Sequence, residues 1–158
     1  MSDSTDRRIV IDDLSGVEIQ ALLRRHGAGM LADSPPDACH FLDVGGLRDP
    51  SITVWSVWDE GALAGCGALR ELNDHHGEVK SMRTADEHLG KGVGRAVLER
   101  IIDVAASRGY RKLSLETGTG PSFDAAVHLY ESVGFVPTGP FGDYSVNDFS
   151  RFFDLTIG

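Results

Sequence analysis

The sequence predicts an α/β fold with a mixed sheet, built as an antiparallel meander, one parallel crossover and a closing hairpin. Short runs rich in β-branched and aromatic residues, separated by turn residues, fill much of the first half of the chain. A glycine-rich turn at residues 89–95 stands between a strand-like run and an amphipathic helix-like run. Another strand-like run follows, and a strand, a covering helix and a second strand form a right-handed crossover between parallel neighbours.

The composition fits one domain spanning residues 1–158, because 158 residues with 41% apolar side chains can build a single core. The net charge of -9 argues against a general affinity for nucleic acid or for an anionic membrane. No apolar run approaches the roughly 20 residues of a membrane span, and the polar start at residues 2–6 lacks the apolar core of a signal peptide. We therefore expect a cytoplasmic protein with no nucleic-acid or membrane partner.

The first predicted elements are a strand and a helix. Residues 8–12 have the short β-branched composition of a strand. Ser15 is predicted to cap the helix, with Glu18 completing a capping box ahead of apolar residues at helical spacing. We expect this helix to fade near Gly27 and Gly29.

The meander comes next. The segment at residues 34–43 breaks at its prolines and is predicted to form a lid or a wall. The strands are expected at residues 52–58, 62–69 and 78–84, joined by a hairpin turn at 59–61 and a second turn at 73–77.

The second half of the chain alternates helices and strands. The helix after the glycine-rich turn is amphipathic, and Gly109 is well placed to end it. The remaining predicted elements are a strand at 112–117, a helix at about 123–133 that Gly134 ends, and closing strands at 135–136 and 152–156.

The glycine-rich turn has the pattern of an anion site. Gly90, Gly92 and Gly94 follow a strand and open directly into a helix. Glycine lets the backbone turn tightly and approach a ligand, while the free N–H groups and the positive end of the helix dipole attract anions. The sequence therefore predicts a phosphate site, to which Lys91 and Arg95 could add a local basic patch.

Residues 79–135 resemble the Gcn5-related N-acetyltransferases, a family marked by Gln/Arg-x-x-Gly-x-Gly/Ala after the fourth strand and by a later Tyr ahead of Gly-Phe. Here the first motif reads Leu89 to Gly94, and the second runs from Tyr130 to Gly134-Phe135. The resemblance implies a mostly antiparallel sheet of about six to seven strands, about four helices and a splayed central pair of parallel strands. A narrower resemblance to a bacterial subgroup of small acetyltransferases rests on residues 34–36, 65–72, 77–84, 115–118 and 139–144.

The resemblance implies acetyl-CoA as cosubstrate. Its diphosphate would lie on the backbone of the glycine-rich turn and its pantetheine arm beside the preceding strand; the implied contacts are Met82, Arg83, Thr84, Leu89, Gly90, Lys91, Gly92, Val93, Gly94 and Arg95. Leu89 departs from the usual Gln or Arg, which weakens side-chain contact with the diphosphate but leaves the backbone donors intact. Phe123 stands where many members carry Asn before the fourth helix, and we expect it to alter the surroundings of the pantetheine thiol.

Two residues match catalytic positions of the family. Tyr130 is implied as the acid that protonates the leaving thiolate, and the alternative is an amphipathic residue on a core-facing helix. Glu78 is implied as the base, and the alternative is a solvated strand-end carboxylate paired with Lys80 two residues away on the same face. Glu71, Glu116 and a chain of waters are the rival bases.

The sequence gives fewer signals for the residues that bind the acetyl acceptor. Arg70, Lys80 and Arg83 could hold a substrate carboxylate, with surface solvation as the alternative. The loop with Asp143 and Tyr144 would border the acceptor by resemblance, or form a plain closing hairpin.

No metal is expected. His75 and His76 are adjacent and have no third ligand nearby in sequence, so we expect exposed turn histidines. Cys39 and Cys66 lack an evident base partner, which disfavours an acyl-enzyme.

These observations predict an acetyl-CoA-dependent N-acetyltransferase that acts on the primary amine of a small molecule, amino-acid-like or another metabolite, by direct transfer in a ternary complex. A non-catalytic acyl-CoA sensor and an acetyltransferase for a protein or peptide amine are the alternatives. A nucleotide-binding protein fits less well, because the glycines lack the dinucleotide spacing. A homodimer is left open.

Overall fold

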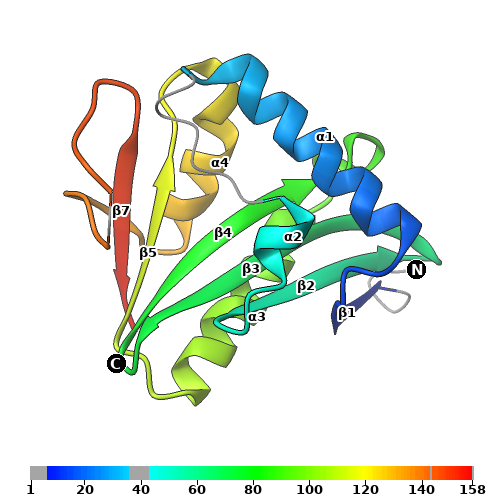
Figure 1. Ribbon diagram of the computed structural model, residues 1–158, viewed down its shortest axis with the longest axis horizontal. Helices are drawn as coiled ribbons and strands as arrows, with labels where there is room; N and C mark the ends of the chain where they lie inside the picture. The colour runs from blue at the N-terminus through cyan, green and yellow to red at the C-terminus, as the bar shows by residue number, and fades with distance from the viewer. Residues whose placement is uncertain (1–6, 36–42, 143, 158) are drawn as a thin grey trace.

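The computed structural model describes residues 7–35, 43–142 and 144–157. Its central feature is a seven-stranded mixed sheet with the strand order β1-β2-β3-β4-β5-β7-β6 (Figure 1). The elements are β1 Arg7–Ile11, α1 Val17–Asp33, α2 Val44–Leu47, β2 Ile52–Asp59, β3 Ala62–Asn73, β4 His76–Thr84, the 3-10 helix η3 Asp86–His88, α3 Val93–Ser107, β5 Lys112–Thr117, α4 Pro121–Ser132, β6 Val136–Thr138 and β7 Arg151–Thr156. The α/β class, the mostly antiparallel sheet and the order of the elements are confirmed.

The single parallel pairing in the described sheet lies between β4 and β5. Three residues at the start of each strand pair, from His76 with Lys112 to Glu78 with Ser114. Beyond Glu78 the two strands separate (Figure 1). The predicted splayed central pair is therefore confirmed, and it opens the sheet in the middle.

Helices cover both faces of the sheet. α3 and α4 pack on one face through a core that includes Val97, Leu98, Ile101, Leu113 and Leu115. α1 and α2 lie on the other face, over a smaller core formed with β2 and β3 (Figure 1). Because side chains alternate along a strand, one strand serves both sides.

Helix α1 differs from the prediction at both ends. Gly16 precedes the helix without a side-chain cap, and Ser15 instead bonds to Asp13 in a local turn, so the predicted capping box is wrong. The helix continues through Gly27 and Gly29 to Asp33. Each glycine costs a helix about 1 kcal/mol, which the burial of its apolar stripe offsets.

Strand β4 begins earlier than expected, because its pairing with β5 starts at His76. His76 is half-buried, with Nε2 2.6 Å from the Ser114 hydroxyl, so the prediction of an exposed turn histidine is wrong there and right for His75. Phe123 lies inside the first turn of α4 rather than before it. Cys39, Asp143 and most of the predicted lid segment fall outside the described residues.

Candidate active site

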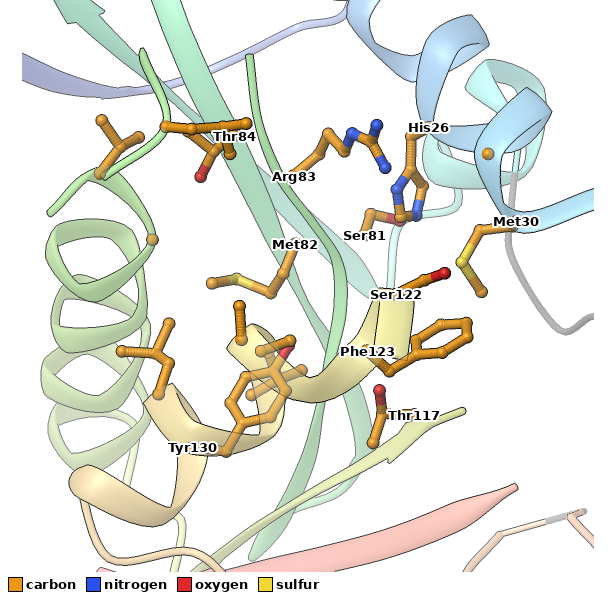
Figure 2. Close-up of a pocket in the computed structure, with 18 of the residues that line it drawn as sticks. His26, Met30, Ser81, Met82, Arg83, Thr84, Thr117, Ser122, Phe123 and Tyr130 are labelled. Carbon is orange, nitrogen blue, oxygen red and sulfur yellow. The ribbon is translucent and has the colours of Figure 1, made fainter. Parts of the chain in front are cut away.

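A cleft of about 630 Å³ lies where β4 and β5 separate. Its walls come from the C-terminal half of α1, from β4, from the glycine-rich turn and the start of α3, and from α4. Figure 2 shows side chains from these elements converging on one space, with Tyr130 at one end and His26 and Met30 at the other. The cleft therefore connects the two faces of the sheet through its splayed centre.

A bulge in β4 decides which side chains face each end of the cleft. Ser81 has a positive φ of 53°, and the register of β4 against β3 shifts beside it. Met82 then points toward α3 and the Arg83 side chain toward α1 (Figure 2). The bulge could not be predicted from the sequence, because serine gives no local signal for positive φ.

The glycine-rich turn ends at the N-terminus of α3. Gly90 and Gly92 both have positive φ, and an added Cβ on either would meet open space. The first intrahelical bond runs from Ala96 N–H to the Gly92 carbonyl at 3.1 Å, so the amides of residues 93–95 lie ahead of it, along the wall of the cleft. These free donors and the helix dipole suit an anionic group.

The side chains around this turn contribute unequally. Leu89 lines the cleft and is 63% exposed. Lys91 does not line it, and its carbonyl accepts a bond of 3.0 Å from Arg7. Arg95 lines the cleft, but its guanidinium donates to the Ser132 hydroxyl at 2.5 Å. The basic patch predicted from the sequence is thus directed partly away from the turn.

Glu78 lies at the narrow end of the splay, and its side chain is deeply buried at 2% exposed. The Lys80 ammonium donates to the Glu78 carboxylate at 3.1 Å, and the Tyr144 hydroxyl donates to the same oxygen at 2.5 Å. The pairing with Lys80 agrees with the sequence, whereas the solvated strand-end alternative for Glu78 is wrong. The chain folds this way because Tyr144, from the loop before β7, covers the pair.

This arrangement perturbs Tyr144. Burial, followed by the charge of Glu78 and the bond to it, raises the pKa of Tyr144 far above its usual value. Its hydroxyl also accepts from Lys80 at 2.9 Å. Tyr144 therefore stays protonated and fixes the position of the carboxylate.

Tyr130 lies on α4 and lines the cleft opposite His26 and Met30 (Figure 2). Its ring packs edge-on against Phe135, with 5.8 Å between the ring centroids. Burial raises the pKa of Tyr130 well above its usual value, so the hydroxyl keeps its proton at neutral pH. A protonated phenol beside the cleft can act as a proton donor.

The rival bases occupy different places. Glu71 accepts a bond of 2.8 Å from Tyr110 and is not part of the cleft wall. Glu116 lines the cleft and accepts from the Ser150 hydroxyl at 2.7 Å. Arg70 pairs across the sheet with Glu78 and is not part of the cleft wall.

Cys66 is fully buried on β3, and burial raises the pKa of its thiol to about 12. It is therefore an inert, buried thiol. Within the described part of the chain, no group of three or more His, Cys, Asp or Glu side chains is placed to hold a metal ion. None of the described helices has the length and hydropathy needed to cross a membrane.

Several cleft residues were not predicted from the sequence, among them His26 and Met30 on α1 and Ser81 at the bulge. His26 continues the apolar stripe of Ile19, Leu22 and Leu23 at helical spacing, which could have identified it. Placing the end of the helix near Gly27 hid this continuation.

Comparison with known proteins places the chain among acetyltransferases. The sequence model of the Acetyltransferase (GNAT) family matches residues 18–135. The uncharacterized N-acetyltransferase YsnE of Bacillus subtilis is 51% identical over 144 residues, covering 91% of this chain and 95% of that protein. The uncharacterized N-acetyltransferase YedL of Escherichia coli is 49% identical over 149 residues, covering 94% of each.

A solved structure shares the fold. The GNAT family acetyltransferase from Elizabethkingia anophelis with acetyl-CoA bound superimposes with a TM-score of 0.70 at 17% identity, over 96% of this chain and 98% of that one.

Proposed function

Because the chain belongs to the GNAT family of acetyltransferases, we propose that it transfers an acetyl group from acetyl-CoA to the primary amine of a small molecule, by direct attack in a ternary complex. The observation that carries this proposal is the continuity of the cleft. One space joins the anion-binding start of α3 to the carboxylate of Glu78, through the gap between β4 and β5.

The residues around the start of α3 suit the diphosphate of acetyl-CoA. The amides of residues 93–95 offer donors, and Gly90 and Gly92 let the backbone approach the ligand without a side chain in between. The pantetheine arm would follow the backbone of β4 at Met82, Arg83 and Thr84, which leads from the turn to the splay. When bound, acetyl-CoA supplies the activated acetyl group.

An attacking amine must first lose a proton. An amine with a pKa of about 10.4 is less than about 0.1% neutral at pH 7, so a proton acceptor has much to contribute. Glu78 fits this role directly or through a water molecule, because it lines the cleft. Lys80 and Tyr144 hold that carboxylate in a fixed position.

The leaving group needs less help. A thiol with a pKa of about 8.5 leaves fairly readily as a thiolate, so protonation by Tyr130 is a smaller contribution. Tyr130 lines the cleft opposite its α1 end and keeps its proton. Transfer through the thiol of Cys66 is disfavoured, because burial keeps that thiol protonated.

The experiment is a measurement of free-thiol release from acetyl-CoA with a panel of small amines and amino acids. Turnover with at least one of them supports the proposal, whereas binding of acetyl-CoA without turnover on any amine or peptide indicates a sensor. The role of Glu78 is read from the pH–rate profile of Glu78→Gln, in which the acidic limb should disappear. Glu71→Gln is the matched control, because Glu71 lies outside the cleft wall, and its acidic limb should remain.

A further inference from the structure

Two buried polar atoms without partners lie at the α1 end of the cleft. The side chain of His26 is 8% exposed, and its Nδ1 has no hydrogen-bond partner among the described residues. The hydroxyl oxygen of Ser81 is also buried and has no partner in the described parts of the chain. Both residues line the same cleft, on α1 and at the β4 bulge (Figure 2). Buried polar groups are nearly always satisfied, so an unfilled pair in one cleft indicates a ligand or ordered water.

Arg83 adds a charge to the same end of the cleft. Its guanidinium lies against α1 at Gly29, where an added Cβ would come within 3.3 Å of Nη1. Its one ion pair among the described residues is with Asp86, at 4.0 Å. Asp86 is more than half exposed and also pairs with Arg25 at 3.5 Å. The Arg83 side chain makes no hydrogen bond within residues 7–35, 43–142 and 144–157, so its donors remain available to a ligand.

The three groups share one chemical property. Burial lowers the pKa of His26 to about 4, so the imidazole is neutral at pH 7 and can present an N–H at Nδ1. The Ser81 hydroxyl and the guanidinium of Arg83 are also donors. Asp33 and Asp86 line the cleft nearby, but both are exposed, and solvent screens their charges.

We propose that His26, Ser81 and Arg83 bind the carboxylate of the acetyl acceptor, and that the acceptor is therefore an amino acid or a close amino-carboxylate rather than a simple amine. A carboxylate accepts from several donors at once and pairs with a guanidinium in a defined geometry. This inference rests on the proposed acetyl transfer to a small amine, whose substrate class it names.

The position of the three residues indicates that they bind the acceptor rather than the cosubstrate. They lie on the α1 face of the cleft, whereas the start of α3 and Tyr130 line its other end (Figure 2). Ser81 stands between Glu78 and Arg83 along β4. A carboxylate at the bulge would leave the amine of a short amino acid at the gap between β4 and β5, within the part of the cleft that Glu78 lines.

The test compares each standard L-amino acid with the amine that remains when its carboxylate is removed. Acetyl transfer is measured for both, and the ratio of kcat/KM values reports the contribution of the carboxylate. Charge-assisted bonds to a carboxylate predict a preference of about ten- to hundredfold for the best amino acid over its amine. A ratio near one for every pair of substrates would overturn the inference while leaving the acetyl transfer intact.

Variants locate the effect. Arg83→Met and Ser81→Ala should each lower the ratio by about tenfold or more, mainly through KM for the amino acid. Arg25→Met is the control, because Arg25 pairs with the same Asp86 but does not line the cleft, and it should leave the ratio unchanged. If Arg83→Met weakens the binding of acetyl-CoA by the same factor as the binding of the amino acid, the guanidinium serves the cosubstrate and the inference is wrong.

A binding measurement keeps the inference testable if no amine is acetylated. Calorimetry on the protein saturated with coenzyme A, using N-acetylated amino acids and the matching N-acetylated amines, reads the carboxylate contribution without turnover. Binding of the carboxylates that Arg83→Met abolishes, without any acetyl transfer, would sustain the carboxylate site and refute the proposed reaction. Equal affinity for the two sets would mean that water alone satisfies His26 and Ser81.

Discussion

Replacing Glu78 by glutamine would leave the ammonium of Lys80 buried without its counter-charge. The two groups are 3.1 Å apart, and Glu78 and Lys80 are only 2% and 9% exposed. Breaking a buried ion pair by removing one partner costs about 3–5 kcal/mol. We expect a loss near the low end, about 3 kcal/mol, because Lys80 keeps the Tyr144 hydroxyl as an acceptor at 2.9 Å. For a chain of this size that corresponds to a fall in Tm of about 6–12 °C.

The assay is urea unfolding of Glu78→Gln, Lys80→Met and the double variant, followed by circular dichroism. Each single variant should lose stability, and the double variant should recover most of it, because no unpaired charge remains buried. A Glu78→Gln protein as stable as the wild type, or a double variant less stable than either single variant, would refute the reasoning. The result also sets the temperature at which turnover of Glu78→Gln can be compared.

Four further outcomes are expected. Gly92→Val should abolish acetyl-CoA binding in calorimetry, because its backbone has φ of +78°, whereas Leu89→Ala, at an exposed side chain, should change Kd by less than about threefold. Tyr130→Phe should lower kcat by about tenfold with KM for acetyl-CoA unchanged, and an unaltered kcat would remove Tyr130 from the mechanism. The folded-state pKa of His26, about 4, lies below the usual histidine value of 6.5, so the unfolded state binds more protons between these values. Unfolding free energy should therefore fall by about 3 kcal/mol as pH drops from 6.5 to 4, and His26→Leu should remove most of this slope. Cys66 should resist alkylation in the native protein and react only on unfolding, as a thiol assay with and without urea would show.

The fold could be predicted because its signals are local. The glycine-rich turn, the hairpin at Glu60 and Gly61 and the helix stop at Gly109 all need positive φ, and the structure has it at each. The splayed strands were predicted from the resemblance to the Gcn5-related N-acetyltransferases, which covered the elements on both sides of the glycine-rich turn. Local chemistry therefore identified where acetyl-CoA was expected to bind.

The acceptor end could not be predicted in the same way, because it depends on packing between distant segments. The burial of Glu78 requires Tyr144, a residue 66 positions further along the chain. The bulge at Ser81 appears only when β4 is paired with β3, since serine gives no local signal for positive φ. His26 lines the cleft only because α1 continues through Gly27 and Gly29. Glycine has a low helix propensity, and tertiary contacts stabilise the helix there.

The most direct test of the account is the intact-protein mass after mixing with acetyl-CoA, read together with the release of free thiol, before and after an amino acid acceptor is added. Direct transfer predicts no acetylated protein and no thiol release until the acceptor is present, and then one acetylated acceptor for each thiol released. Thiol release without an acceptor, together with a protein heavier by one acetyl group, would contradict the account.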